Sequence, residues 1–362
     1  MTNRPISVAN NLQSFLLLLR GVSRSFYLSI RLLPQAVRAP IAVGYLLARA
    51  TDTVADTTAL PQPERLALLH RLLGAIELPM GDLVAVRPLL DEFAKQQTHP
   101  HEQALMSALP QCLLLLQNLS PADQASVRWV LRFITQGQLL DVTRFGQGIQ
   151  ALNSEQELTD YTWQVAGCVG EFWTELCARH LDSFASLPTD TMRATGSRYG
   201  MGLQRLNILR DAGADLAGGR CYLPLDRLAA LDLNPAQLSQ AVALGDSATL
   251  LRVAPLFNEY LNLTQAQLLD GLHYSCALHS RRLRVASALP ALIGTRTLAL
   301  LRQAGPHAWQ QSIKMPRPEI RALLWRLFWR GASPKALAQE FARLSAPCSA
   351  LNAHKQCENL TS

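Results

Sequence analysis

Apolar residues recur every three or four positions along most of this chain, and this spacing is the feature that most limits its fold. The segments IAVGYLLARATDTVA, ERLALLHRLLGAI and ASVRWVLRFITQGQLL show it best. Such spacing puts an apolar stripe along one side of a helix. Alternating strand patterns and Asn-Gly turns are missing from the sequence. The sequence therefore predicts an all-α protein.

Prolines and capping residues divide the periodic segments. Because the residue before a proline avoids the helical region, X-Pro steps predict helix boundaries. Such steps are Leu33-Pro34, Leu60-Pro61, Leu187-Pro188 and Asn234-Pro235, while Ser120-Pro121 and Asp190 are typical of helix starts. No repeat of 20 to 50 residues and no long linker is evident. We predict one domain over residues 1–345 and a loose tail over 346–362, where the periodicity is lost.

The composition supports a folded protein of the cytoplasm. Hydrophobic residues make up 49% of the 362 residues and charged residues 17%, which is enough for a large core. The seven cysteines are scattered and lack zinc spacing, as expected of reduced thiols. The apolar run at residues 15–19 is too short for a signal peptide, and no stretch approaches the roughly 18 to 20 apolar residues of a membrane span. We therefore expect a cytoplasmic protein without a transmembrane segment.

The formal net charge of +7 suits an anionic partner, which can be a phosphate ligand, an acidic membrane surface or a nucleic acid. No helix-turn-helix or aromatic-basic pattern supports nucleic-acid binding. The sequence also lacks a G-x-G-x-x-G loop and a Walker A loop, which argues against Rossmann and P-loop nucleotide sites. The charge alone does not choose between phosphate and membrane.

Two acidic pairs stand out within the helical pattern. Asp52 and Asp56 end the segment YLLARATDTVAD, and Asp211 and Asp215 end the segment QRLNILRDAGAD. A spacing of four residues puts both carboxylates of a pair on one face of a helix, where they repel each other. A bound cation would relieve this repulsion, and Mg²⁺ prefers carboxylate and phosphate oxygens. Two such helices facing each other would hold a diphosphate through bridging Mg²⁺.

The spacing by itself is a weak signal. With 15 Asp residues, chance gives about 0.6 such pairs, so the spacing of either pair alone favours a solvated helix face. Both pairs, however, lie in otherwise apolar segments, and each follows an arginine, Arg49 or Arg210. An arginine beside buried carboxylates serves either as a structural ion pair or as a ligand of a diphosphate.

Four motifs together resemble the squalene/phytoene synthases, which join two prenyl diphosphates head to head, and the resemblance covers about residues 21–330. Val22–Phe26 (VSRSF) resembles the opening diphosphate motif, and YLLARATDTVAD resembles the first aspartate motif in its squalene-synthase form. Tyr161 with VAGCVG at residues 165–170 is similar to the helix that lines the reaction cavity. GLQRLNILRDAGADLAGGRCYLP resembles the second aspartate motif. The resemblance implies an isoprenoid-synthase-type helical bundle around a central apolar cavity.

The resemblance also implies roles for individual residues. The magnesium ligands would be Asp52, Asp56, Asn207, Asp211 and Asp215. The substrate-binding residues would be Ser23, Arg24, Ser25, Tyr45, Arg49, Gln204, Asn207, Arg210, Arg220 and Tyr274. The catalytic residues would be Arg49, Arg210 and Tyr161, the last handling a proton or steadying a cation, although a core tyrosine is the alternative for Tyr161. Ala55 stands where eukaryotic squalene synthases usually carry Glu, which bears on the number of metal ions.

The implied reaction is Mg²⁺-dependent condensation of two farnesyl diphosphates through presqualene diphosphate, followed by reduction with NADPH to squalene. Lys314 and Arg317 resemble the basic segment that holds the NADPH phosphates, and a solvated basic loop is the alternative. A dehydrosqualene or phytoene synthase would omit the reduction. A non-catalytic helical protein that binds membranes is the alternative from another class.

Two segments bear on a membrane partner. Ser280–Arg284 is a basic cluster that suits anionic headgroups or water. Leu323–Arg330 is rich in Trp and Arg, which suits either peripheral contact with the membrane surface or a core helix with snorkelling arginines. Peripheral contact at the inner face of the membrane therefore stays open.

Overall fold

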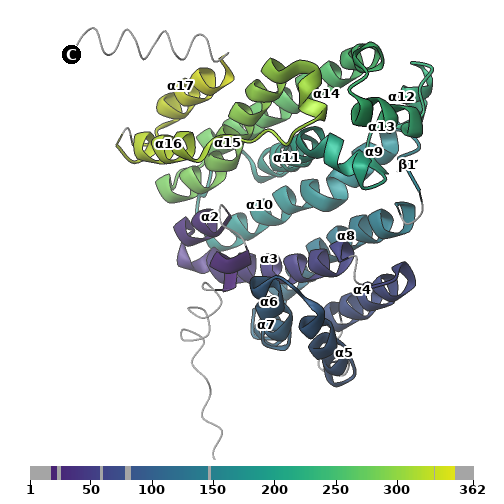
Figure 1. Cartoon of the computed structure of the whole chain (residues 1–362). Helices are drawn as coiled ribbons and strands as arrows, with labels where there is room; N and C mark the ends of the chain where they lie inside the picture. Colours follow the sequence, from purple (N-terminus) through teal and green to yellow (C-terminus); the bar gives the residue numbers. More distant parts are fainter. Residues whose placement is uncertain are drawn as a thin grey trace, which may run out of the picture. The chain divides into compact units, whose positions relative to one another are not determined.

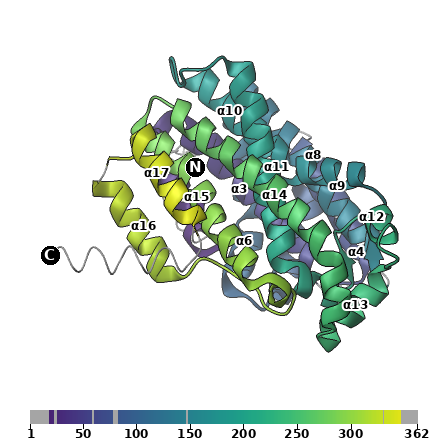
Figure 2. The same ribbon diagram turned by 90° about the horizontal axis from the view of Figure 1, so that it is seen from above.

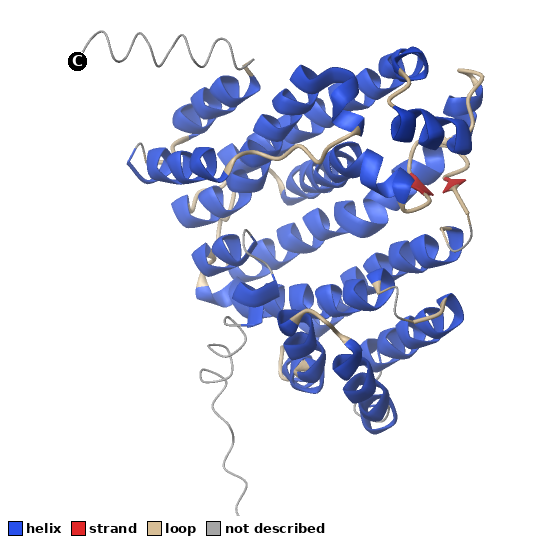
Figure 3. Cartoon of the chain, in the orientation of Figure 1, coloured by secondary structure: helices blue, strands red, loops and turns tan. Residues whose placement is uncertain are grey.

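The computed structural model of the chain is built almost entirely from helices (Figure 3). It describes residues 18–22, 26–57, 60–77, 83–145, 148–329 and 331–346. Within these ranges, the sheet is limited to β1 (Gln150–Ala151) and β2 (Arg220–Cys221), which pair in parallel, and one isolated bridge. The all-α prediction is confirmed.

The chain divides into two compact units, and the single-domain prediction stays a prediction. The first unit comprises Met1–Thr143 and Phe172–Phe184. Its helices, seen in Figure 1, are α2 (Phe26–Leu32), α3 (Gln35–Asp56), α4 (Gln62–Glu77), α5 (Leu83–Gln96), α6 (Pro100–Ser107), α7 (Leu109–Gln117), α8 (Pro121–Arg144) and most of α10 (Cys168–His180). One side of α3 is buried in this unit, which leaves its polar side for the acidic motif.

The second unit comprises Arg144–Glu171 and Ala185–Ser362. Its helices are α9 (Glu155–Thr162), the π-helix η1 (Trp163–Gly167), the start of α10, α11 (Thr189–Ala217), α12 (Leu225–Ala229), α13 (Pro235–Leu244), α14 (Ser247–Ala277), α15 (Arg281–Ala304), the 3₁₀-helix η2 (Gly305–Trp309), α16 (Arg317–Trp329) and α17 (Pro334–Ser345). The long helices α11, α14 and α15 pack in sequence order, and α17 packs on α14 and α15 (Figure 2). The core of this unit is therefore formed by its three longest helices.

Helix starts fall where the sequence predicts them. α3, α4 and α11 begin one residue after a proline, and α8 begins at Pro121. α13 begins after Asn234, whose side chain accepts a hydrogen bond from the Gln237 N–H at 2.9 Å, while the Gln237 side chain accepts from the Asn234 N–H at 3.0 Å. This reciprocal capping box satisfies two N–H groups that the helix cannot satisfy itself.

Glycines let α11 approach its neighbours at backbone distance. A Cβ atom at Gly200 would lie 2.1 Å from the Ala166 carbonyl oxygen, and one at Gly170 would lie 1.9 Å from the Gly196 oxygen. These contacts lie at and just after η1, in the VAGCVG segment. The π-helix and the glycines together bring this segment against α11, next to Tyr161 at the end of α9.

By length and composition, Arg281–Trp309 is the one helix in the described part of the chain that is apolar enough to cross a membrane. However, 67% of its most apolar stretch is buried inside the protein. That degree of burial is typical of a core helix, and α15 indeed packs against α14 and α17. The expectation that the chain has no transmembrane segment stays a prediction.

We predict that Gly200→Ala destabilises the protein, because the added methyl group meets a backbone oxygen that cannot rotate away. The expected loss is about 1 to 3 kcal/mol of unfolding free energy, larger than the gain in helix propensity of about 1 kcal/mol. Gly218→Ala is the matched control, since its Cβ would meet atoms only at 3.4 and 3.5 Å. Chemical denaturation of both variants measures the effect, and equal stability would contradict this packing.

Candidate active site

The first acidic motif lies on a single polar face of α3. Tyr45, Arg49, Asp52 and Asp56 follow one another at intervals of three or four residues, so they share one side of the helix. The opposite side is buried through residues such as Leu46 and Leu47. The structure thus brings the four predicted residues of this motif onto one face.

Arg49 links the motif to a residue that the sequence analysis missed. Its guanidinium forms an ion pair with Asp52 and a second one, at 2.7 Å, with Glu102 of α6. Glu102 lies 53 positions away along the chain and belongs to no recognisable motif, so only the fold brings it to Arg49. Because two carboxylates hold it, the Arg49 head group is fixed beside the aspartates.

The surroundings of Asp52 on α3 change its acidity. Burial, and then the negative charge of Asp56, raise the pKa of Asp52 to about 6, although Arg49 counteracts both effects. The Asp52 side chain is 39% exposed, so part of it reaches solvent. A carboxylate in this position would gain from a further positive charge.

The second acidic motif repeats this arrangement on α11. Gln204, Asn207, Asp211 and Asp215 lie on one face of the helix at intervals of three or four residues. Asn207 is exposed and donates its side-chain N–H to the Gln204 oxygen at 3.4 Å. Arg210 donates to both carboxylate oxygens of Asp211, at 3.0 and 3.1 Å. In this motif, too, an arginine of the same helix binds one of the aspartates.

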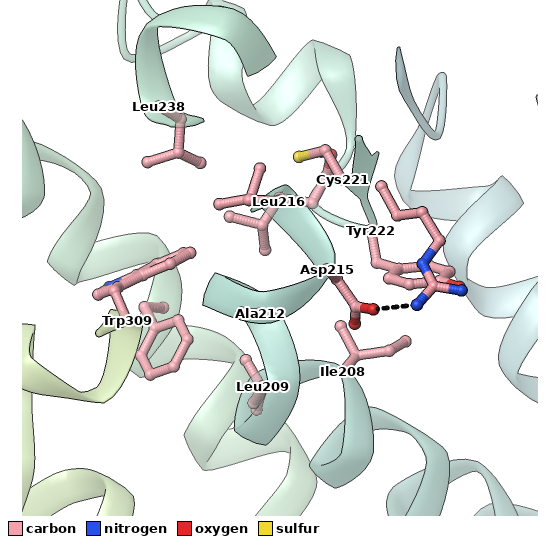
Figure 4. Close-up of a pocket in the computed structure, with 12 residues that line it drawn as sticks. Ile208, Leu209, Ala212, Asp215, Leu216, Cys221, Tyr222, Leu238 and Trp309 are labelled. Atoms are coloured by element: carbon pink, nitrogen blue, oxygen red, sulfur yellow. Dashed lines mark hydrogen bonds and ion pairs between the residues drawn. The ribbon is translucent and has the colours of Figure 1, made fainter. Parts of the chain in front are cut away.

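A turn at the end of α11 places Arg220 beside Asp215. Gly219 has a φ of +81°, which non-glycine residues rarely adopt, and it reverses the chain into β2. Arg220 then forms an ion pair with Asp215 at 2.9 Å (dashed in Figure 4). The predicted GGRCYLP segment therefore returns its arginine to the second aspartate.

The pocket behind Asp215 is apolar and filled. Figure 4 shows Leu209, Leu216 and Trp309 pointing into it, with Asp215 at its edge. Its free volume is about 10 Å³, which is barely room for one water molecule. The acidic end of α11 thus packs against apolar side chains that leave almost no room for water.

Residues after η2 reach the second motif. The Ser312 hydroxyl donates to Asp211 Oδ1 at 3.0 Å. Burial acts to raise the pKa of Asp211, but Arg210, Ser312 and the positive charge of Lys314 hold it below its usual value. Lys314, predicted as a cofactor contact, is therefore a close electrostatic neighbour of a predicted metal ligand, although the two are distant in sequence. An open pocket of about 430 Å³ lies against Arg210, Asp211 and Ser312.

Tyr161 is a buried tyrosine with a partner that the sequence did not reveal. It is 3% exposed, and its hydroxyl donates to the Tyr222 hydroxyl at 3.4 Å. The two rings stack with centroids 5.2 Å apart, and Phe145 packs against the edge of Tyr222. Tyr222 comes two residues after Arg220, so the same turn positions both.

Other predicted residues are reported as the structure has them. Ser23, Arg24 and Ser25 lie outside the described residues. Tyr274 is 2% exposed in α14, and Arg317 is exposed at the first position of α16. Among the described residues, no three His, Cys, Asp or Glu side chains converge as a ready metal site. Each motif therefore offers a carboxylate pair, not a complete cage, and the assigned roles stay predictions.

Long helices with aspartate pairs beside arginines are typical of helical enzymes that act on prenyl diphosphates. A model of the squalene/phytoene synthase family matches residues 19–321. The chain belongs to this family, whose members are prenyltransferases of isoprenoid biosynthesis. The predicted family and fold class are confirmed.

Some of the individual relatives are phytoene synthases and others are squalene synthases. The chain is 29% identical to a phytoene synthase of Mycobacterium bovis over 295 residues, which cover 78% of this chain and 83% of the relative. It is 26% identical to human squalene synthase over 220 residues, which cover 60% of this chain and 48% of the human protein. The solved structure of TcSQS in complex with ligand E5700 has the same fold, with a TM-score of 0.71, 19% identity and coverage of 92% of this chain and 90% of that one.

We predict that Asp52 opposes folding of the metal-free protein at neutral pH. Its pKa of about 6 lies above the usual 3.8, so the charged form costs stability above pH 6, and the cost disappears toward pH 4. Asp52→Asn should stabilise the protein by about 1 kcal/mol at pH 8, after allowance for solvent screening of a partly exposed group. The gain should shrink as the pH falls to 5.

Thermal unfolding in EDTA across this pH range measures the effect. The control is Asp91→Asn, which changes an aspartate that is 54% exposed and only loosely paired with Arg87 at 4.0 Å. A less stable Asp52→Asn variant at pH 8 would contradict the raised pKa.

Proposed function

We propose that this protein condenses two farnesyl diphosphates to presqualene diphosphate and reduces this intermediate to squalene. The observation that carries the proposal is that each helix carries two aspartates on one face with arginines beside them: Arg49 pairs with Asp52 on α3, and Arg210 and Arg220 pair with Asp211 and Asp215 at α11 and β2. The two charges of a magnesium diphosphate are complementary to those of such a pair. Its metal suits the carboxylates, and its phosphates suit the guanidiniums.

In this proposal the arginines bind and orient diphosphate. The guanidiniums of Arg49, Arg210 and Arg220 are planar donors that match phosphate oxygens. Glu102 positions Arg49 from its far side, so that Arg49 keeps its place when its partner changes from Asp52 to a phosphate. Negative charge that develops on the leaving diphosphate meets these cations, which favours ionisation of the prenyl substrate.

The carboxylates fit magnesium by their chemistry. Burial, and then repulsion by Asp56, raise the pKa of Asp52, and a divalent cation would offset both effects. Asp211 and Asp215, with Asn207 one turn earlier, offer a second set of oxygen ligands. When bound, Mg²⁺ would neutralise charge on the leaving diphosphate. A pair of carboxylates per helix suffices, because Mg²⁺ usually keeps several water and phosphate ligands.

Tyr161 is our candidate for the group beside the reacting carbons. After one diphosphate leaves, the double bond of the second substrate attacks the allylic cation, and a proton is lost as the cyclopropane ring closes. Tyr161 and Tyr222 supply hydroxyl groups and stacked rings in a dry setting. Aromatic rings can stabilise a nearby cation, and exclusion of water prevents its capture as an alcohol.

Lys314 and Arg317 suit the phosphates of NADPH. Both are exposed, so an anion can reach them, although the charge of Lys314 also acts on Asp211. When bound, NADPH would supply the hydride that converts the final carbocation to squalene. The open pocket beside Arg210, Asp211 and Ser312 is large enough for part of a ligand.

A second candidate is a phytoene or dehydrosqualene synthase, which releases its product without reduction. The specific observation in its favour is the identity to the mycobacterial phytoene synthase over 78% of this chain. Under this alternative, Lys314 would serve the diphosphate next to Asp211 and not NADPH.

The purified full-length protein tests the proposal when it is incubated with farnesyl diphosphate and Mg²⁺, with and without NADPH. We expect presqualene diphosphate without NADPH and squalene only with it, and no turnover in EDTA. Dehydrosqualene whether or not NADPH is present, or phytoene from geranylgeranyl diphosphate, would replace the proposal with the second candidate. Absence of diphosphate release from both substrates would overturn both.

Single variants separate the two basic residues. Arg317→Ala should raise the KM for NADPH about ten-fold or more, the usual effect of losing one charge-assisted contact. It should leave the consumption of farnesyl diphosphate unchanged. Lys314→Ala should slow both half-reactions, because the charge of Lys314 also acts on Asp211. Time courses of both products measure the split, and an unchanged NADPH dependence in both variants would remove this segment from the cofactor site.

A further inference from the structure

Three large aromatic side chains lie exposed on α16. Trp325, Phe328 and Trp329 are 64%, 69% and 66% exposed. Their rings contact one another, with centroids 5.4 Å apart for the two tryptophans and 5.6 Å for Phe328 and Trp329. We call these three residues the α16 aromatic patch. Exposed aromatic side chains gathered in one place usually mark a binding surface.

Contacts with the rest of the unit fix the orientation of α16, and they place the patch on the solvent side of the helix. Leu323 is 0% exposed and Leu327 is 3% exposed, and these residues form the inward side of the helix. Arg326 is held by Glu340 of α17 at 3.0 Å. Figures 1 and 2 show α16 running beside α17 and α15. The helix therefore already has its packed side, and the aromatic residues lie on the other.

The surroundings of the patch are strongly basic. Residues 281–346 contain 12 Lys and Arg but only two acidic residues, Glu319 and Glu340, a formal charge of +10 (12 minus 2). The whole chain carries +7, so the positive excess of the protein is concentrated in this stretch. Glu319 pairs with Arg296 and Glu340 with Arg326, which leaves no unpaired acid in the described part of this stretch.

Exposed arginines lie directly at the aromatic residues. Arg281 donates to the backbone oxygen of Phe328 at 2.9 Å, which joins the basic start of α15 to the end of α16. Arg282 is exposed next to it, and Arg321 is exposed one turn before Trp325. Aromatic rings bordered by arginines suit the boundary between acyl chains and anionic headgroups, where Trp is enriched.

We propose that the α16 aromatic patch inserts into the headgroup region of a membrane that contains anionic lipids, with Arg281, Arg282 and Arg321 against the phosphates. The charge complementarity selects this partner, because a zwitterionic surface or an apolar protein face would leave the arginines unmatched. Such binding is peripheral and reversible. It goes beyond the proposed function, because it requires no turnover and is the same for any prenyl product.

Vesicle binding by the full-length protein tests the proposal. We expect co-sedimentation with vesicles of phosphatidylglycerol and phosphatidylcholine in equal parts, little with phosphatidylcholine alone, and weaker binding as salt rises. The triple variant Trp325→Ser, Phe328→Ser, Trp329→Ser should bind on the order of 100-fold more weakly. The double variant Arg281→Gln, Arg282→Gln should bind these vesicles about five-fold more weakly for each arginine removed.

A matched control replaces exposed apolar residues elsewhere in the same unit: Leu244→Ser, Leu251→Ser and Leu263→Ser, which are 74%, 63% and 39% exposed. It should bind as the parent does. Because the patch is exposed, the triple variant should keep its helical circular dichroism and its turnover of soluble substrate, so failure of the proposed function would not affect this test. Equal vesicle binding by parent and triple variant would overturn the proposal. The proposal would also be overturned if the parent protein forms a dimer and the triple variant does not, since the patch would then bind a second copy.

Discussion

A carboxylate on a helix that is otherwise buried has to be matched by positive charge, and the arrangement of both motifs follows from this requirement. Asp211 has Arg210, Asp215 has Arg220, and Asp52 has Arg49. In each case the partner is at most five residues away in the sequence. The motifs are therefore local structures: each carries its own counter-charges, and the packing of the rest of the unit only has to leave one face of the helix open.

The match is incomplete on α3, and this difference is informative. Asp211 has a pKa below its usual value, because Arg210, Ser312 and Lys314 together outweigh its burial. Among the residues that the structure describes, Arg49 is the one cation paired with Asp52, and it is shared with Glu102; the pKa of Asp52 is raised to about 6. Position 55 is consistent with this picture, since a Glu in place of Ala55 would add negative charge to the same turn. Of these two aspartates, Asp52 thus gains more from a further positive charge.

Short-range features of both fold and site were predictable from the sequence, whereas long-range ones were not. Pro188 and Asn234 act within one helical turn, so they determine where α11 and α13 begin whatever the rest of the chain does. The contact of Arg49 with Glu102 spans 53 positions, and that of Ser312 with Asp211 spans 101. Neither residue type signals its partner, because a glutamate or serine on a helix or loop is usually solvated.

The outward position of the α16 aromatic patch follows from the same rule of charge matching. Glu340 is only 2% exposed, and it binds both Arg326 of α16 and Arg343 of its own helix. Arg326 lies between the buried Leu323 and Leu327 in sequence and anchors this side of α16 to α17. Rotation of the helix to bury the aromatic rings would break that pair and leave a buried carboxylate short of charge, at a cost of several kcal/mol. Exposure of the three rings is therefore the less costly arrangement, and the two acids of this basic stretch serve to fix it.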